Sequence, residues 1–136
     1  MPEMRGVIVI ALLSVGSLAR ANGDVDFELL VSELHEAKLK SRARLSLSIV
    51  PRPGRRLFEA GPVVLHPSGD GVSWEHGILY KEDAVDPAAE IPRFEIGFVP
   101  TQAGTHQLRV HCTFYLCDAK RCRPVESEAS WTVTSN

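Results

Sequence analysis

The chain has 136 residues, of which 44% are hydrophobic and 24% charged, with 15 Lys and Arg against 17 Asp and Glu. A net charge of −2 leaves no basic surplus, so nucleic acids and anionic membranes are not expected as partners. The length suits one compact domain.

The first 21 residues have the layout of a secretory signal peptide. Arg5 precedes an apolar run over residues 6–18, and Ala19-Arg20-Ala21 forms a small-residue end of the A-x-A kind. The run is shorter than the roughly 20 residues that span a bilayer. We therefore expect a signal peptide over residues 1–21 and a single exported domain over residues 22–136, in the periplasm or outside the cell. An uncleaved N-terminal anchor is the alternative. No second apolar run follows, so no membrane span is expected in the mature chain.

Alternating apolar and polar residues predict short strands along the rest of the chain. The expected strands cover residues 25–31, 45–49, 63–65, 94–98, 105–116 and 129–133, with an edge strand at 55–58 and a strand or structured loop at 72–80. Turn-forming residues at 51–54, 67–71 and 101–104 separate them, and 81–89 is expected to be a loop. Residues 32–40 are rich in helix formers and predict a short helical turn or loop. The pattern predicts an all-β, immunoglobulin-like antiparallel sandwich of about seven strands.

All three cysteines lie in or just after the longest alternating segment, residues 105–116. Cys112 shares the parity of the apolar residues in this segment, so we expect a buried thiol there. Cys117 has the opposite parity, and the polar residues 118–121 suit a hairpin loop that would place Cys122 opposite it. Cross-strand Cβ atoms lie about 4.5–5.5 Å apart, close to disulfide distance, so a Cys117–Cys122 disulfide is predicted.

The predicted disulfide admits two main interpretations. In the first, it is a structural clamp in a binding or assembly module. However, by the chain-entropy estimate a disulfide that closes so short a loop stabilises the folded state by only about 2 kcal/mol, which is little for a structural bond. In the second, the pair exchanges electrons with other thiols. Lys120, Arg121 and Arg123 favour this interpretation because nearby cations stabilise a thiolate.

A Cu(I) site built from Cys117, Cys122 and His111 is a minor third hypothesis, since these side chains supply sulfur and nitrogen ligands. The cysteine spacing does not match a paired C-x-x-C zinc site, so no metal is expected at the leading site. No dinucleotide, P-loop, hydrolase or metalloprotease motif is present, and no cofactor is expected.

The segment Phe114-Tyr-Leu-Cys117-Asp-Ala-Lys-Arg-Cys122-Arg-Pro124 resembles the C-x(n)-C-x-P segment of a known family. This family comprises the periplasmic N-terminal domain of the thiol:disulfide interchange reductase DsbD and the related disulfide bond corrector domains. Residues 45–54 resemble the family's strand before a Pro-Gly turn. The resemblance implies an immunoglobulin-like sandwich and, if the protein is an enzyme, a thiol:disulfide oxidoreductase with Cys117 and Cys122 as its redox-active pair. It also implies that a partner attacks the first cysteine, Cys117.

The resemblance further implies protein thiols and disulfides of the cell envelope as partners. No transmembrane or thioredoxin segment follows in the sequence, so we expect a separate membrane electron donor. Two departures from the family's pattern are present. Its better-known members have one more residue between the cysteines, and they carry an aromatic cap loop, for which residues 74–80 are the candidate here.

Overall fold

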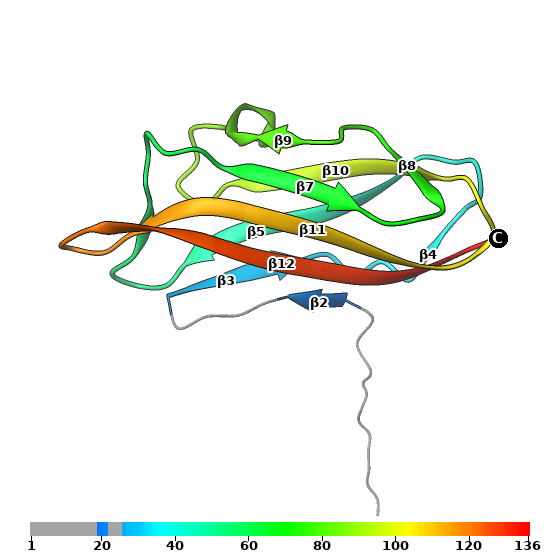
Figure 1. Ribbon diagram of the computed structural model, residues 1–136, viewed down its shortest axis with the longest axis horizontal. Helices are drawn as coiled ribbons and strands as arrows, with labels where there is room; N and C mark the ends of the chain where they lie inside the picture. The colour runs from blue at the N-terminus through cyan, green and yellow to red at the C-terminus, as the bar shows by residue number, and fades with distance from the viewer. Residues whose placement is uncertain (1–18, 22–25) are drawn as a thin grey trace, which may run out of the picture.

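The computed structural model describes residues 19–21 and 26–136, which form two β-sheets packed face to face (Figure 1). In chain order the strands are β2 (Ala19–Ala21), β3 (Phe27–Val31), β4 (Glu36–Ala37), β5 (Ala43–Pro51), β6 (Arg56–Leu57), β7 (Val64–Ser68), β8 (Val72–Trp74), β9 (Leu79–Tyr80), β10 (Arg93–Pro100), β11 (Gly104–Cys117) and β12 (Cys122–Ser135), with a 3-10 turn η2 (Lys81–Asp83) after β9. The predicted all-β antiparallel sandwich is confirmed, although the described residues form more strands than the expected seven or so.

One sheet has the strand order β3-β5-β10-β8. The other has the order β2-β12-β11-β7-β9, with β4 pairing to β12 and β6 pairing to β11. The order β3-β5-β10-β8 corresponds to strands A-B-E-D of an immunoglobulin sandwich, and β12-β11-β7 corresponds to strands G-F-C. Every strand pair is antiparallel except β4 with β12, which is parallel.

The core lies between the two sheets and follows the alternation in the sequence. Residues of one parity on β5, β10, β11 and β12 are buried, because side chains along a strand point to opposite faces. The largest of them are Trp131, Phe94, Phe98, Phe114, Leu45, Leu47, Ile49, Ile96 and Leu108. The indole N–H of Trp131 donates a 2.8 Å hydrogen bond to the Ser32 carbonyl, which satisfies its polar atom inside the core.

The short helical turn considered for residues 32–40 does not form. Glu36 and Ala37 instead make β4, which pairs with Thr134 and Ser135. The backbone N–H of Thr134 also donates to the carbonyl of His35 at 2.9 Å. Pairing with a distant strand therefore overrides the local helix preference.

Two further expectations are refined by the structure. Pro67 and Ser68 belong to β7 rather than to a turn. Residues 72–80 contain two short strands that join different sheets, β8 beside β10 and β9 beside β7. Within residues 19–21 and 26–136, no helix is long and apolar enough to cross a membrane.

The predicted signal peptide falls mostly on residues 1–18, which lie outside the described residues. Its expected last residues, Ala19–Ala21, form β2, which pairs with residues 129–131 of β12. The leader and its cleavage therefore stay predictions.

The long hairpin of β11 and β12 positions the candidate site. Its strands have 14 residues each and remain paired from Gly104 opposite Ser135 to Cys117 opposite Cys122. The hairpin runs along the long axis of the molecule and carries its tip to one end, at the left of Figure 1. This tip holds the disulfide.

Candidate functional site: a disulfide at the hairpin tip

Cys117 and Cys122 form the predicted disulfide across the last pair of the hairpin. The loop between them is closed by a 2.9 Å hydrogen bond from the Asp118 N–H to the Arg121 carbonyl. One carboxylate oxygen of Asp118 accepts hydrogen bonds from the backbone N–H groups of Lys120, at 2.7 Å, and Arg121, at 2.9 Å. These backbone hydrogen bonds lower the pKa of Asp118. The carboxylate thus holds the turn that brings the cysteines together.

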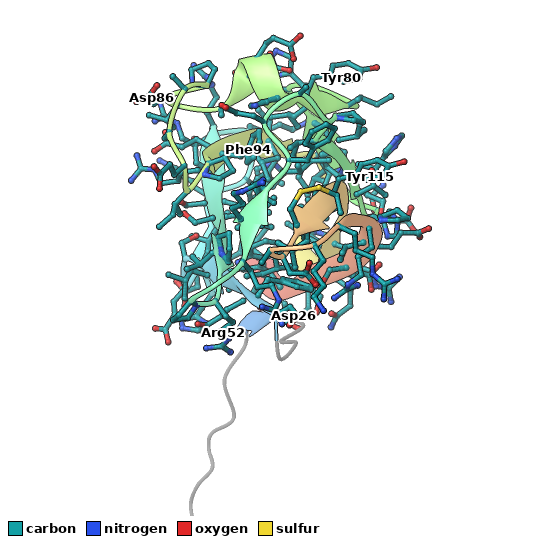
Figure 2. The ribbon with its side chains drawn as sticks, turned by 90° about the vertical axis from the view of Figure 1, so that its left-hand side faces the viewer. Asp26, Arg52, Tyr80, Asp86, Phe94 and Tyr115 are labelled. Carbon is teal, nitrogen blue, oxygen red and sulfur yellow. A yellow bond between two sulfur atoms is a disulfide. The ribbon has the colours of Figure 1, made fainter. Side chains whose placement is uncertain are left out.

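The two cysteines differ in their access to solvent. Cys122 is exposed, whereas Cys117 is 0% exposed. Cys117 has the parity of the outer face, but it is flanked on one side by β6, where Arg56 is its partner, and on the other by β12. Figure 2 looks onto this end of the molecule, with the sulfur–sulfur bond facing the viewer. The family resemblance implies attack at Cys117, but the geometry makes Cys122 the accessible residue of the pair.

Basic side chains from two distant segments gather beside the disulfide. Arg56 lies opposite Cys117, while Lys120, Arg121 and Arg123 lie within or next to the hairpin loop. Cations near a sulfur favour its thiolate, which is the form that attacks or leaves in exchange.

Asp26 ties these two segments together. It lies 3.0 Å from Arg55 Nε and 2.7 Å from an Nη atom of Arg123. The hydrogen bond from Arg123 holds the pKa of Asp26 below its ordinary value. The carbonyl of Asp26 also accepts a 2.9 Å hydrogen bond from the Arg52 N–H. The start of β3, the β5–β6 turn and the hairpin are therefore joined beside the disulfide.

The segment that pairs with Cys117 differs from the expected cap. Residues 56 and 57 pair with β11, and the Phe58 N–H donates a 2.9 Å hydrogen bond to the Tyr115 carbonyl. Within the proposed cap of residues 74–80, by contrast, Trp74 packs on Phe98 with ring centroids 5.6 Å apart, and Tyr80 pairs with β7. Sequence reasoning missed Asp26, Arg55 and Arg56 because all three are distant from the cysteine motif in the sequence.

Cys112 is a buried free thiol, as predicted. It is 0% exposed, and desolvation by burial, aided by the charge of Glu128, raises its pKa to about 12. Its S–H group donates a weak 3.9 Å hydrogen bond to the Val110 carbonyl. At neutral pH this thiol is protonated and shielded.

The residues of the minor Cu(I) hypothesis are not brought together. His111 lies six positions before Cys117 on an extended strand, a distance of about 20 Å at roughly 3.3 Å per residue. Its Nε2 atom is 3.2 Å from Glu126 Oε1, and the two sulfur ligands are bonded to each other. Across the described part of the chain, no group of three or more His, Cys, Asp or Glu side chains could hold a metal ion.

Comparison with known proteins adds no identification. No protein-family model matches the chain, and no curated protein sequence matches it. The fold therefore defines the class as an all-β sandwich with a tip disulfide. The likeness to the DsbD domain rests on the cysteine motif and on the strand before the Pro-Gly turn.

Proposed function

We propose that this protein is an exported thiol:disulfide exchange domain that passes electrons through Cys117 and Cys122. The unequal exposure of the two cysteines carries the proposal. An incoming thiolate can reach Cys122, while Cys117 is kept from competing solutes. The oxidising compartment that persistent disulfides require agrees with export to the periplasm or the extracellular space.

The reaction balances as a two-electron exchange. A partner thiolate attacks the sulfur of Cys122, forms a mixed disulfide with it and breaks the Cys117–Cys122 bond. Cys117 leaves as a thiolate, which the cations around it stabilise, and it takes a proton from water. A second thiolate of the partner then attacks the partner sulfur of the mixed disulfide and releases Cys122 as a thiolate, which is also protonated. The partner leaves as a disulfide and this domain as a dithiol, and the reverse sequence passes the electrons onward.

The structural-clamp hypothesis receives less support from the fold. The hairpin is already paired along its whole length, and the bond closes a loop with a sequence separation of only 5. Closing so short a loop contributes only about 2 kcal/mol in the chain-entropy estimate. The partners proposed for exchange are protein thiols and disulfides of the cell envelope, with a separate membrane protein as the electron donor.

The first experiment measures the reduction potential of the pair in defined thiol buffers. A value above about −230 mV lies in the range of exchange proteins, and we expect such a value here. A value below about −300 mV would mark a structural bond and contradict the proposal.

Two single variants test which sulfur is attacked. Cys117→Ser leaves the exposed Cys122 free, so it should trap partner proteins from the cell envelope as mixed disulfides that reductant releases. Cys122→Ser leaves only the buried Cys117 at the tip and should trap at least ten times less. Equal trapping by both variants would contradict the assignment of Cys122.

A further inference from the structure

We infer that the disulfide end is a docking surface for a protein whose reactive cysteine is flanked by carboxylates. This inference rests on the proposed exchange function and specifies its partner. It starts from an uneven distribution of charge. The chain as a whole carries a net charge of −2, yet six of its 15 Lys and Arg residues belong to the two segments beside the disulfide. They are Arg52, Arg55, Arg56, Lys120, Arg121 and Arg123.

Three of these cations remain available to a partner. Arg55 and Arg123 are engaged by Asp26, and Arg52 lies 3.8 Å from Glu28. The other three form no ion pair with any described residue and are exposed. We call these three, Arg56, Lys120 and Arg121, the cationic collar.

The carboxylate of Asp118 offsets only part of the positive charge of the collar. Asp118 lies in the hairpin loop, and one of its carboxylate oxygens accepts hydrogen bonds from two backbone N–H groups of the turn. The collar therefore retains an excess of positive charge around Cys122. Clustered cations at a surface raise the local concentration and the association rate of anionic partners.

Apolar contact area adjoins the collar. Phe58 is 42% exposed and Tyr115 is 39% exposed, and their backbones are hydrogen-bonded to each other. Exposed aromatic side chains beside arginines are typical of protein interfaces. A small anion would use the charge but not this aromatic surface, which favours a protein as the occupant.

Charge of the opposite sign lies on another side of the molecule. Glu82, Asp83, Asp86 and Glu90 lie in or after η2, which Figure 1 shows away from the hairpin tip, and Figure 2 shows Asp86 on the side opposite Asp26 and Arg52. An acidic partner is therefore attracted to the hairpin tip rather than to the η2 side. This separation of charge favours contact of the partner's sulfur with Cys122.

The test compares the rates at which thiols reduce the Cys117–Cys122 bond. The probes are two cysteine peptides of equal length, one flanked by aspartates and one by lysines, with β-mercaptoethanol as the uncharged reference. Each rate is corrected for the thiolate fraction of its probe, because flanking charges shift thiol pKa values. At low salt we expect the aspartate peptide to react about ten times faster than the lysine peptide. The preference should vanish near 1 M salt, where the Debye length is about 3 Å.

Matched variants locate the effect. The collar variant Arg56→Gln/Lys120→Gln/Arg121→Gln should lose most of the preference, measured as the ratio of the aspartate-peptide rate to the lysine-peptide rate. This ratio does not depend on how far the loss of thiolate-stabilising cations lowers the rate with every thiol. The control Lys38→Gln/Lys40→Gln/Arg109→Gln removes the same charge at exposed positions away from the disulfide and should keep the preference.

The outcomes separate this inference from the proposed function. Reduction by all three thiols without a charge preference, or a preference that survives in the collar variant, would overturn the docking surface and leave exchange standing. Failure of every thiol to reduce the bond would overturn both. Self-association of the oxidised protein that the collar variant abolishes would replace the acidic partner with a second copy, whose η2 side supplies the carboxylates.

Discussion

Cys112 and Cys117 lie on the same strand, yet one is a free buried thiol and the other is bonded in a disulfide. Cys112 lies between β7 and β12 with its side chain in the core, where its thiol is protonated and shielded. Cys117 lies at the strand's end and is bonded to the exposed Cys122. The position of a cysteine along β11 therefore decides whether it is a core thiol or one half of the tip disulfide.

The largest expected effect is on the rate at which the core thiol, Cys112, is alkylated. At about pH 8, Cys112 in the folded protein should react with iodoacetamide about a thousand times more slowly than in the unfolded protein, because its pKa rises from 9.0 to about 12. The variant Cys117→Ser/Cys122→Ser isolates Cys112 for this measurement by mass spectrometry. Similar rates in the folded and unfolded states would show that the core thiol is accessible.

A smaller difference is expected in stability. Replacing both tip cysteines with alanine should lower the free energy of unfolding by about 2 kcal/mol and leave the sheets intact. Urea denaturation followed by circular dichroism measures this loss. The control Cys112→Ser buries a hydroxyl among apolar residues and should cost about 1–3 kcal/mol. If losing the disulfide prevented folding, the clamp hypothesis would gain over exchange.

The smallest effect concerns the turn between the tip cysteines. Since the pKa of Asp118 in the folded protein is lowered, its carboxylate stabilises the turn above the unfolded value of 3.8, and this contribution is lost as pH falls through the lowered pKa. The amide shifts of Lys120 and Arg121 should therefore titrate with a midpoint below 3.8. In Asp118→Asn this transition should be absent. A midpoint at or above 3.8 in the native chain would mean that these hydrogen bonds do not persist in solution.

Much of the fold followed from local patterns. The alternation over residues 105–116 correctly placed Leu108, Val110 and Cys112 in the core, and the polar loop correctly predicted the cysteine pairing. These features depend on neighbours in the sequence, which pattern reasoning captures well.

The features that escaped prediction depend on distant segments. Parity placed Cys117 on the outer face, but the residue is buried, and β6, from about sixty residues earlier, pairs with it. Likewise, helix-forming residues gave no hint that Glu36 and Ala37 would pair with the last strand. The bridge from Asp26 to Arg123 joins residues 97 positions apart, and no spacing rule finds such a contact.

The bond at the hairpin tip also bears on strand register. A slip of β12 by one residue would turn its buried side chains, among them Ala129, Trp131 and Val133, toward solvent. The bond between Cys117 and Cys122 makes that slip impossible while the protein is oxidised. In the dithiol state the slip is opposed by non-covalent contacts, among them core burial, the Asp118 turn and the hydrogen bond from Trp131 to the Ser32 carbonyl. In the proposed exchange cycle, reduction of the bond would therefore remove a covalent constraint on strand register, and reoxidation would restore it.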